Sequence, residues 1–173
     1  ASKIWEQSAE APTDHPYLIS KKVHPHGLKF SRGKLVVPLY YQDSALQSLQ
    51  FIGPDGDKKF LSGGLTKGCY YPIEGALDKI IYVAEGFATA ATVHEATGSA
   101  VAVAFNANNL ESIAKALRAK FPNLEMVICA DDDHQTKGNP GIRKAIEAAA
   151  ATRSKVVIPE FNENRSDSDT DFN

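Results

Sequence analysis

The sequence predicts an α/β protein: an open, mainly parallel sheet flanked by helices, preceded by a small mixed and largely antiparallel N-terminal lobe. Two patterns predict this. After residue 78, short apolar segments alternate with helical segments, which is typical of parallel βαβ units. Between residues 34 and 73, strand-like segments are separated by turn residues, which is typical of an antiparallel meander. We therefore expect an N-terminal lobe over residues 1–77, an α/β domain over residues 78–161 and an acidic, mobile tail over residues 162–173.

The N-terminal lobe is expected to begin with a short helix near residues 17–22, followed by a turn. Strands are then predicted over residues 35–41, 46–52 and 58–61. Pro38 lies inside the first of these strands. Because proline has no N–H group to donate to a neighbouring strand, it predicts an edge position or a bulge.

The α/β domain is predicted to have four strands joined by three helices. The strands are expected over residues 80–84, 100–104, 125–130 and 155–158, and the helices over residues 87–96, 110–121 and 140–152. Gly98 ends the first helix, since glycine adopts positive φ at little cost. Asn108 or Asn109 caps the second helix, and Asn139 caps the third with Pro140 at its first position.

The composition is that of an ordinary globular protein: the 173 residues are 43% hydrophobic and 23% charged. No apolar run approaches the ~20 residues that a membrane span needs, and the first residues contain no apolar signal segment. We expect the chain to be a fragment of a longer protein. Its two cysteines, Cys69 and Cys129, argue against a disulfide framework and fit a reducing cytoplasm.

Charge is divided unevenly along the chain, although the net charge is only −2. Residues 1–70 carry nine Lys or Arg and six Asp or Glu, giving +3, whereas residues 71–173 carry ten and fifteen, giving −5. A basic first part and an acidic second part suit a protein that holds phosphate with one part and cations with the other. Chance asymmetry between two solvated surfaces stays open as the alternative. The low net charge argues against a protein that simply coats nucleic acid.

Acidic residues follow two of the predicted parallel strands. Glu85 follows the first strand of the α/β domain, and Asp131 and Asp133 follow the third. Ligands of an open parallel sheet bind beyond the carboxyl ends of its strands. If these two strands are neighbours, the three carboxylates meet at one edge of the sheet, while Asp132 points elsewhere or bonds locally.

Such an acidic cluster predicts a metal site. Carboxylates about 4 Å apart repel by roughly 4 kcal/mol per pair at an effective dielectric constant of about 20, so a cation or a proton is needed between them. Oxygen ligands suit Mg²⁺ or Mn²⁺, and two such ions would activate a hydroxyl and stabilise a leaving pyrophosphate. The alternative is that the acids only cap the following helices, which suits Asp132 or Asp133 better than Glu85.

The order and spacing of these residues resemble the TOPRIM domain. The resemblance rests on a strand followed by Glu85-Gly86 and a later strand followed by Asp131-x-Asp133. Three longer motifs resemble the TOPRIM domain of phage- and plasmid-type primases, including primase/helicase proteins: EGFATAA at 85–91, AFNANNL at 104–110 and ADDDH at 130–134. The first half agrees as well, so the resemblance covers nearly the whole chain.

The resemblance implies the catalytic core of a DNA primase, a cytoplasmic nucleotidyltransferase in phage or plasmid DNA replication. It implies that Glu85, Asp131 and Asp133 bind Mg²⁺ or Mn²⁺ and catalyse the template-directed synthesis of RNA primers. Its expected partners are a single-stranded DNA template, ribonucleoside triphosphates and a helicase domain in the same full-length chain, with no membrane. By position, Lys59 and Lys67 match basic residues of the family that lie beside the metal.

Further candidates for binding nucleic acid or nucleotides are Arg32, Lys34 and Asn106. Each has an ordinary alternative: the cations can be solvated surface residues, and Asn106 can form a local turn at the end of its strand. Four further residues either contact a ligand or are ordinary surface residues: His134, Lys137 and the two tail residues Asp169 and Asp171.

Three other functions stay open. A TOPRIM nuclease would use the same acids to cleave DNA, and a non-catalytic module of a larger replication protein would only bind nucleic acid or nucleotides. A receiver-type α/β domain also has acids at its strand ends, but it would have an acidic pair after its first strand, where this chain has Glu85 and Gly86. A topoisomerase fits less well, since no separate domain with a catalytic tyrosine fits this length.

Overall fold

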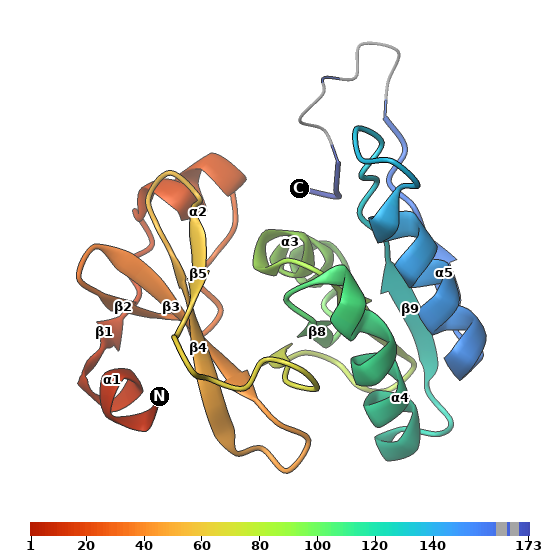
Figure 1. Ribbon diagram of the computed structural model, residues 1–173, viewed down its shortest axis with the longest axis horizontal. Coiled ribbons are helices and arrows are strands. Elements are labelled where there is room, and N and C mark those ends of the chain that lie inside the picture. The colour runs from red at the N-terminus through yellow and green to blue at the C-terminus, as the bar shows by residue number, and fades with distance from the viewer. Residues whose placement is uncertain (162–165, 167–169) are drawn as a thin grey trace. The chain divides into compact units, whose positions relative to one another are not determined.

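The computed structural model describes residues 1–161, 166 and 170–173. The chain forms two compact units, residues 1–71 and residues 72–173 (Figure 1). The sequence places this boundary between residues 77 and 78. The structure divides the chain earlier because β6 (Tyr71–Ile73), which the sequence assigns to the N-terminal meander, pairs within the second sheet.

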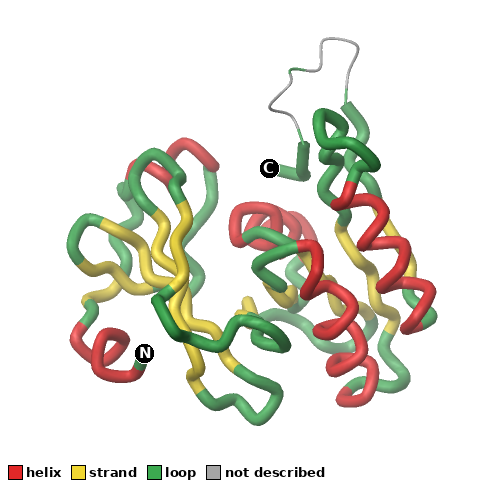
Figure 2. The backbone as a smooth tube through the Cα atoms, viewed as in Figure 1, coloured by secondary structure: helices red, strands yellow, loops and turns green. Residues whose placement is uncertain are grey.

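The first unit contains a five-stranded antiparallel sheet whose strands follow the chain order. The three predicted strands and the helix near residues 17–22 are confirmed, whereas the two remaining strands have only two and three residues and are too short to show an alternating pattern. Figure 2 shows this unit as strands with short helical segments. Its elements are α1 (Ser2–Gln7), β1 (Ala9–Glu10), α2 (Pro16–Lys21), β2 (Lys29–Ser31), β3 (Lys34–Tyr40), β4 (Leu46–Ile52) and β5 (Lys58–Phe60).

Pro38 lies in β3, which pairs with β2 on one side and with β4 on the other. The pairing with β2 ends at Val36, before the proline is reached. Pro38 pairs with Leu49 of β4, and the register shifts between Leu39 and Tyr40. Pro38 therefore has a free edge on the side of β2, because the pairing with β2 stops before the proline. The register shift after Leu39 corresponds to the predicted bulge.

The second unit contains a five-stranded sheet with the strand order β10-β9-β7-β8-β6. The pairs β10–β9, β9–β7 and β7–β8 are parallel, as predicted. α3 packs on β7 and β8, while α4 and α5 pack on each other and reach β7, β9 and β10 (Figure 1). The elements are β7 (Ile80–Ala84), α3 (Phe87–Thr97), β8 (Val101–Val103), α4 (Leu110–Lys120), β9 (Glu125–Cys129), α5 (Pro140–Thr152) and β10 (Lys155–Val157).

The direction of the connections reverses between β7 and β9. The connection through α3 leads from β7 to β8 on one side of the sheet, and the connection through α5 leads from β9 to β10 on the other side. Right-handed crossovers therefore place α3 on one face of the sheet and α4 and α5 on the opposite face. The carboxyl ends of β7 and β9 flank the topological switch point, which is where ligands bind in open α/β sheets.

The ends of the helices were predicted partly correctly. Gly98 ends α3 with a φ of 70°, and Asn139 caps α5 through a hydrogen bond from the Ile142 N–H with Pro140 in the first turn. Asn109 precedes α4 but caps nothing with its side chain. Its Nδ2 instead donates to the carbonyl oxygen of Ala104 at 2.9 Å, which fixes the end of β8 to the start of α4.

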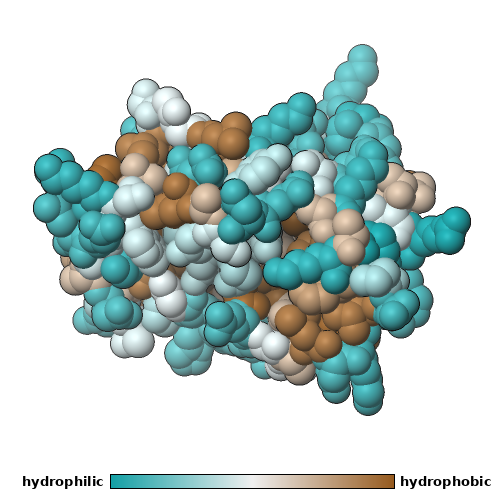
Figure 3. All heavy atoms as spheres, turned by 90° about the horizontal axis from the view of Figure 1, so that it is seen from below, coloured by the Kyte–Doolittle hydropathy of each residue, from teal (hydrophilic) through white to brown (hydrophobic). Residues whose placement is uncertain are grey.

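The surface is mixed in hydropathy. On the face drawn in Figure 3, hydrophilic side chains cover most of the surface and apolar side chains form patches between them. Among the described residues, no helix is both long and apolar enough to cross a membrane.

Candidate functional site

Glu85 lies directly after β7 at the switch point and is half-buried. Its carbonyl oxygen accepts a hydrogen bond from the Phe105 N–H at 2.8 Å, so the residue after β7 is tied to the residue that follows β8. Gly86 then precedes α3, and its carbonyl oxygen accepts the first helical bond from Ala90. The helix therefore begins within two residues of the carboxylate, as expected for a residue held at the rim of the sheet.

Phe105 has a feature that the sequence did not indicate: its φ is 70°, in the left-handed region. A bulky residue adopts this conformation only when its surroundings impose it. Here the side chain is buried and the N–H is bonded to Glu85. The strained turn after β8 thus holds the backbone of the candidate catalytic glutamate.

Asp131 lies two residues after β9. β7 and β9 pair directly, with Ala84 opposite Cys129, so Glu85 and Asp131 follow neighbouring strand ends. The Oδ1 atom of Asp131 is buried although the residue as a whole is half-buried. Burial, with a smaller contribution from the Asp131 carboxylate, raises the pKa of the Cys129 thiol to about 12.

Asp133 is bound to the first turn of α5. Its Oδ2 atom accepts a hydrogen bond from the Gly141 N–H at 2.9 Å. A β-carbon on Gly141 would lie 2.1 Å from the carbonyl oxygen of Asp131 and 3.0 Å from Oδ2 of Asp133, so only glycine fits here. Asp132 points to Asn139, whose Nδ2 donates to its Oδ1. Asp132 therefore bonds to the residue that precedes α5, in line with the expectation that it bonds locally, and Asp133 caps the same helix.

The structure brings the three predicted acids to one edge of the sheet, but not into one tight cluster. Among the described residues, Glu85, Asp131 and Asp133 do not bring their carboxylate oxygens within 4.8 Å of one another. The Gly141 N–H holds Asp133 toward α5. The donor set of three carboxylates, one with a buried oxygen, fits a divalent cation with oxygen ligands.

The end of the chain returns to this edge. The Asp132 N–H donates to the carbonyl oxygen of Thr170 at 2.6 Å, and Nδ2 of Asn173 donates to the Thr92 hydroxyl of α3 at 2.9 Å. Asp171 is described and half-buried beside these contacts, whereas Asp169 lies outside the described residues. The last residues of the predicted tail thus lie at the acidic edge.

Asn106 lies at the end of β8, beside the residue bonded to Glu85. It is half-buried, and it precedes a short 3₁₀ helix without capping it through its side chain. Its carbonyl oxygen accepts the N–H of Asn109 at 3.0 Å, which closes a local turn. The local turn that the sequence offered as an alternative role for Asn106 is therefore formed by its backbone and does not involve its side chain.

Two of the basic candidates of the first unit, Lys34 and Lys59, lie on one face of its sheet. Lys59 of β5 pairs with Phe51 of β4, and Phe51 pairs with Val36 of β3, so these side chains share a face with Lys34. Nζ of Lys34 lies 3.3 Å from Oδ2 of Asp57. The hydrogen bond from Lys34 holds the pKa of the Asp57 carboxyl below its usual value, with further contributions from Asp55 and from the Lys59 charge.

The other two basic candidates are exposed. Arg32 forms the turn between β2 and β3 with a φ of 51°. Lys67 lies in the loop before Tyr70 and is not part of the Lys34 and Lys59 face. His134 and Lys137 are exposed in the loop before α5. His94 bonds through its ring to the carbonyl oxygen of Ser99 at 2.9 Å, a structural contact.

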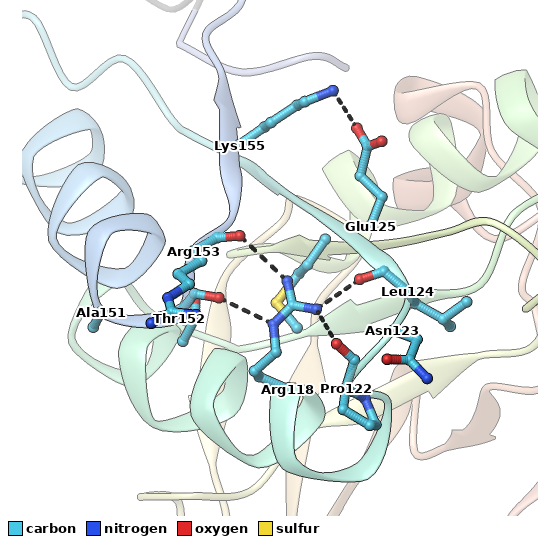
Figure 4. Close-up of a pocket in the computed structure, with 10 residues that line it drawn as sticks. Arg118, Pro122, Asn123, Leu124, Glu125, Ala151, Thr152, Arg153 and Lys155 are labelled. Carbon is cyan, nitrogen blue, oxygen red and sulfur yellow. Dashed lines mark hydrogen bonds and ion pairs between the residues drawn. The ribbon is translucent and has the colours of Figure 1, made fainter.

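A pocket of about 600 Å³ lies at the opposite end of the second unit, beside the C-terminal ends of α4 and α5 (Figure 4). Arg118 spans it, donating to the carbonyl oxygens of Leu124 at 2.6 Å, Thr152 at 3.0 Å and Pro122 at 3.3 Å. The last carbonyls of a helix lack helical partners, and a cation there also interacts well with the helix dipole. Arg118 therefore stabilises the fold, and its sequence position gave no sign of this.

The second unit is an α/β domain with an open, mainly parallel sheet and acidic residues at its switch point, as predicted from the sequence. Residues 80–173 match the Toprim domain family, and the chain belongs to that family. The resemblance drawn from Glu85-Gly86 and Asp131-x-Asp133 is thereby confirmed.

Known proteins similar to this chain include "DNA primase TraC" from Escherichia coli, with 41% identity over 157 residues. That match covers 84% of this chain but only 15% of the relative. The primase fragment of the bacteriophage T7 primase-helicase protein has a similar fold, with a TM-score of 0.58 and 18% identity over 83% of this chain and 64% of that chain. The DnaG catalytic core has a TM-score of 0.57 and 12% identity over 85% and 64% of the two chains. These structures confirm the predicted fold class.

Proposed function

We propose that this chain is the catalytic core of a DNA primase, which synthesises RNA primers on a DNA template with Mg²⁺ or Mn²⁺. The observation that carries the proposal is the position of Glu85, Asp131 and Asp133 after two directly paired parallel strands at the switch point. The similarity to a DNA primase over most of the chain supports it.

In the proposed reaction, the 3′-hydroxyl of one ribonucleotide attacks the α-phosphate of the next, and the bond to pyrophosphate breaks. Bound divalent ions would lower the pKa of the hydroxyl and offset the charge that develops on the phosphates. Glu85, Asp131 and Asp133 would hold these ions. The bond from Phe105 to Glu85 and the bond from Gly141 to Asp133 keep the two strand ends in place before any ligand binds.

The cations of the first unit would attract nucleic acid and triphosphates. Lys59, Lys34 and Arg32 would neutralise backbone phosphates on their face of the sheet, and Lys67 would add a further cation from its loop. Asn106 would orient a bound nucleotide through its amide, which no described turn or cap uses. In the full-length protein, we place this core in the cytoplasm beside a helicase domain that delivers single-stranded template during phage or plasmid replication.

The test compares Glu85→Gln with Glu111→Gln, an exposed glutamate of α4 that pairs with Lys115. Both variants lose one negative charge, but only the first removes a proposed ligand. Each is incubated with single-stranded DNA, ribonucleoside triphosphates and Mn²⁺. Glu85→Gln should reduce primer synthesis by at least about 100-fold, while Glu111→Gln keeps it.

Two results would contradict the proposal. Equal synthesis by Glu85→Gln and the unchanged chain would remove Glu85 from the catalytic role. Cleavage of the DNA by the unchanged chain, without any primer, would replace the primase with a nuclease that uses the same acids.

A further inference from the structure

A small pocket within the first unit is unexplained by the acidic site. It has a volume of about 290 Å³ and lies between α1 and the sheet. This is near the lower end of the size range of small-molecule sites, which suits one ring with its substituents. We call it the α1 pocket, and its lining residues are Ile4, Gln7, Ser31, Arg32, Lys34 and Phe51.

Two apolar side chains line the α1 pocket from opposite elements. Phe51 comes from β4 and is only half-buried, so part of its ring is available. Ile4 comes from α1 and is also half-buried. An aromatic ring beside an aliphatic side chain accommodates a flat heterocycle, because every nucleobase presents a π-face that stacks on such a ring.

Three polar side chains of the α1 pocket have no hydrogen bond to any described residue: Gln7, Ser31 and Arg32. An amide and a hydroxyl can each donate and accept, which matches the mixed donors and acceptors on the edge of a nucleobase. The guanidinium group offers the paired donors that suit a phosphate. The polar groups are therefore available to a ligand.

Positive charge surrounds the same pocket. Lys34 lines it, and Lys59 pairs with Phe51 across the sheet, so its side chain lies on the same face. Asp57 lies 3.3 Å from Lys34, and Asp55 lies beside Asp57, so these two carboxylates offset part of this charge. Arg32, Lys34 and Lys59 outnumber the two acids, and an anionic ligand is favoured.

We propose that the α1 pocket binds one nucleotide unit, with the base stacked on Phe51 and the phosphate held by Arg32 and Lys34. This inference rests on the proposed function, which supplies the nucleotide chemistry. The unit can belong to a single strand of DNA or to a free nucleoside triphosphate, since both present a base and a phosphate. Stacking on Phe51 accepts any base.

The experiment measures the binding of a labelled oligothymidine strand and of ATP to the whole chain in EDTA. Phe51→Leu removes the aromatic ring and keeps an apolar side chain. Its matched control is Phe60→Leu, which changes the neighbouring strand on the opposite face of the sheet. Phe51→Leu should weaken strand binding about tenfold, the usual effect of losing one stacking ring, whereas Phe60→Leu changes it less than twofold.

Arg32→Gln tests the phosphate contact, with Lys3→Gln of α1 as the control for the loss of one charge. Arg32→Gln should reduce the magnitude of the slope of log affinity against log salt by about one. Lys3→Gln should reduce this slope by less. Thermal unfolding followed by circular dichroism shows whether Phe51→Leu folds. If it does not fold, Arg32→Gln still tests the proposal.

The two arms identify the source of the nucleotide. A loss of strand binding alone assigns the pocket to a single strand, and an equal loss of ATP binding assigns it to a free nucleotide. Equal binding by Phe51→Leu and Phe60→Leu in both arms overturns the proposal. Because EDTA removes divalent ions, the result does not depend on catalysis. If primer synthesis fails while Phe51→Leu still weakens binding, only the proposed function is lost.

Discussion

Gly141 offers the sharpest test of how the acidic edge is held together. In Gly141→Ala, the new β-carbon would lie 2.1 Å from the carbonyl oxygen of Asp131 and 3.0 Å from Oδ2 of Asp133. Non-bonded atoms are comfortable at about 3.5 Å or more, so the first turn of α5 must move away from Asp131 by more than 1 Å. That movement would stretch the 2.9 Å hydrogen bond from Gly141 to Asp133.

The magnitude follows from three contributions. Overpacking costs about 1–3 kcal/mol, and the weakened bond to a charged acceptor costs up to about 1.5–3 kcal/mol. Alanine in a helix regains about 1 kcal/mol relative to glycine. We expect Gly141→Ala to lower the free energy of unfolding by about 2–4 kcal/mol, which would lower the Tm by about 5–12 °C for a chain of this size.

The assay is urea unfolding followed by circular dichroism, with Ala150→Gly as the control. Ala150 is exposed in the same helix, so its replacement measures helix propensity alone, about 1 kcal/mol of destabilisation. Propensity by itself predicts that Gly141→Ala is stabilising. A neutral or stabilising effect of Gly141→Ala would therefore refute the close packing described for Asp131 and Asp133.

Three further predictions concern contacts elsewhere. Arg118→Ala should lower the free energy of unfolding by about 2–4 kcal/mol, because several carbonyl oxygens lose a charged donor. Its control is Arg143→Ala, in an exposed pair with Glu147, which should change the free energy of unfolding by less than about 0.5 kcal/mol. Equal urea midpoints for the two variants would contradict the stabilising role of Arg118. Asn109→Ala should cost about 1–3 kcal/mol by leaving the Ala104 carbonyl oxygen without its donor, and the exposed neighbour Asn108 serves as the control. Lys34→Gln should raise the pKa of Asp57 in an NMR titration, since the hydrogen bond from Lys34 is the largest cause that lowers this pKa. The stabilisation by this pair is present above the unfolded pKa of about 3.9 and is lost as the pH falls through the lower folded pKa. An unchanged pKa of Asp57 in the variant would show that the pair does not form.

Much of the second unit could be predicted because its signals are local. The apolar runs, Gly98 and the Asn139-Pro140 pair each act within a few residues, and all are confirmed. β6 and β2 are different, because three residues carry no period and their place depends on distant partners. The sequence therefore defines the parallel sheet better than it defines the boundary between the units.

The acidic edge could be predicted in kind but not in detail. Strand ends and an acidic triplet indicate a metal site, yet the positive φ of Phe105 and the close fit of Gly141 arise only from contacts between separate strands and helices. Arg118 is likewise invisible in the sequence, since its acceptors come from the backbone of two segments about thirty residues apart. Contacts of this kind depend on the tertiary structure and leave no periodic pattern.

We propose that the acids after β7 and β9 hold divalent ions, and a crystal soaked in Mn²⁺ tests this most directly. Anomalous diffraction locates the ions independently of any activity. We predict anomalous peaks at the switch point, in contact with carboxylate oxygens of Glu85, Asp131 and Asp133. Mn²⁺ bound elsewhere on the chain, with no peak beside any of these three carboxylates, would show that they do not form the metal site.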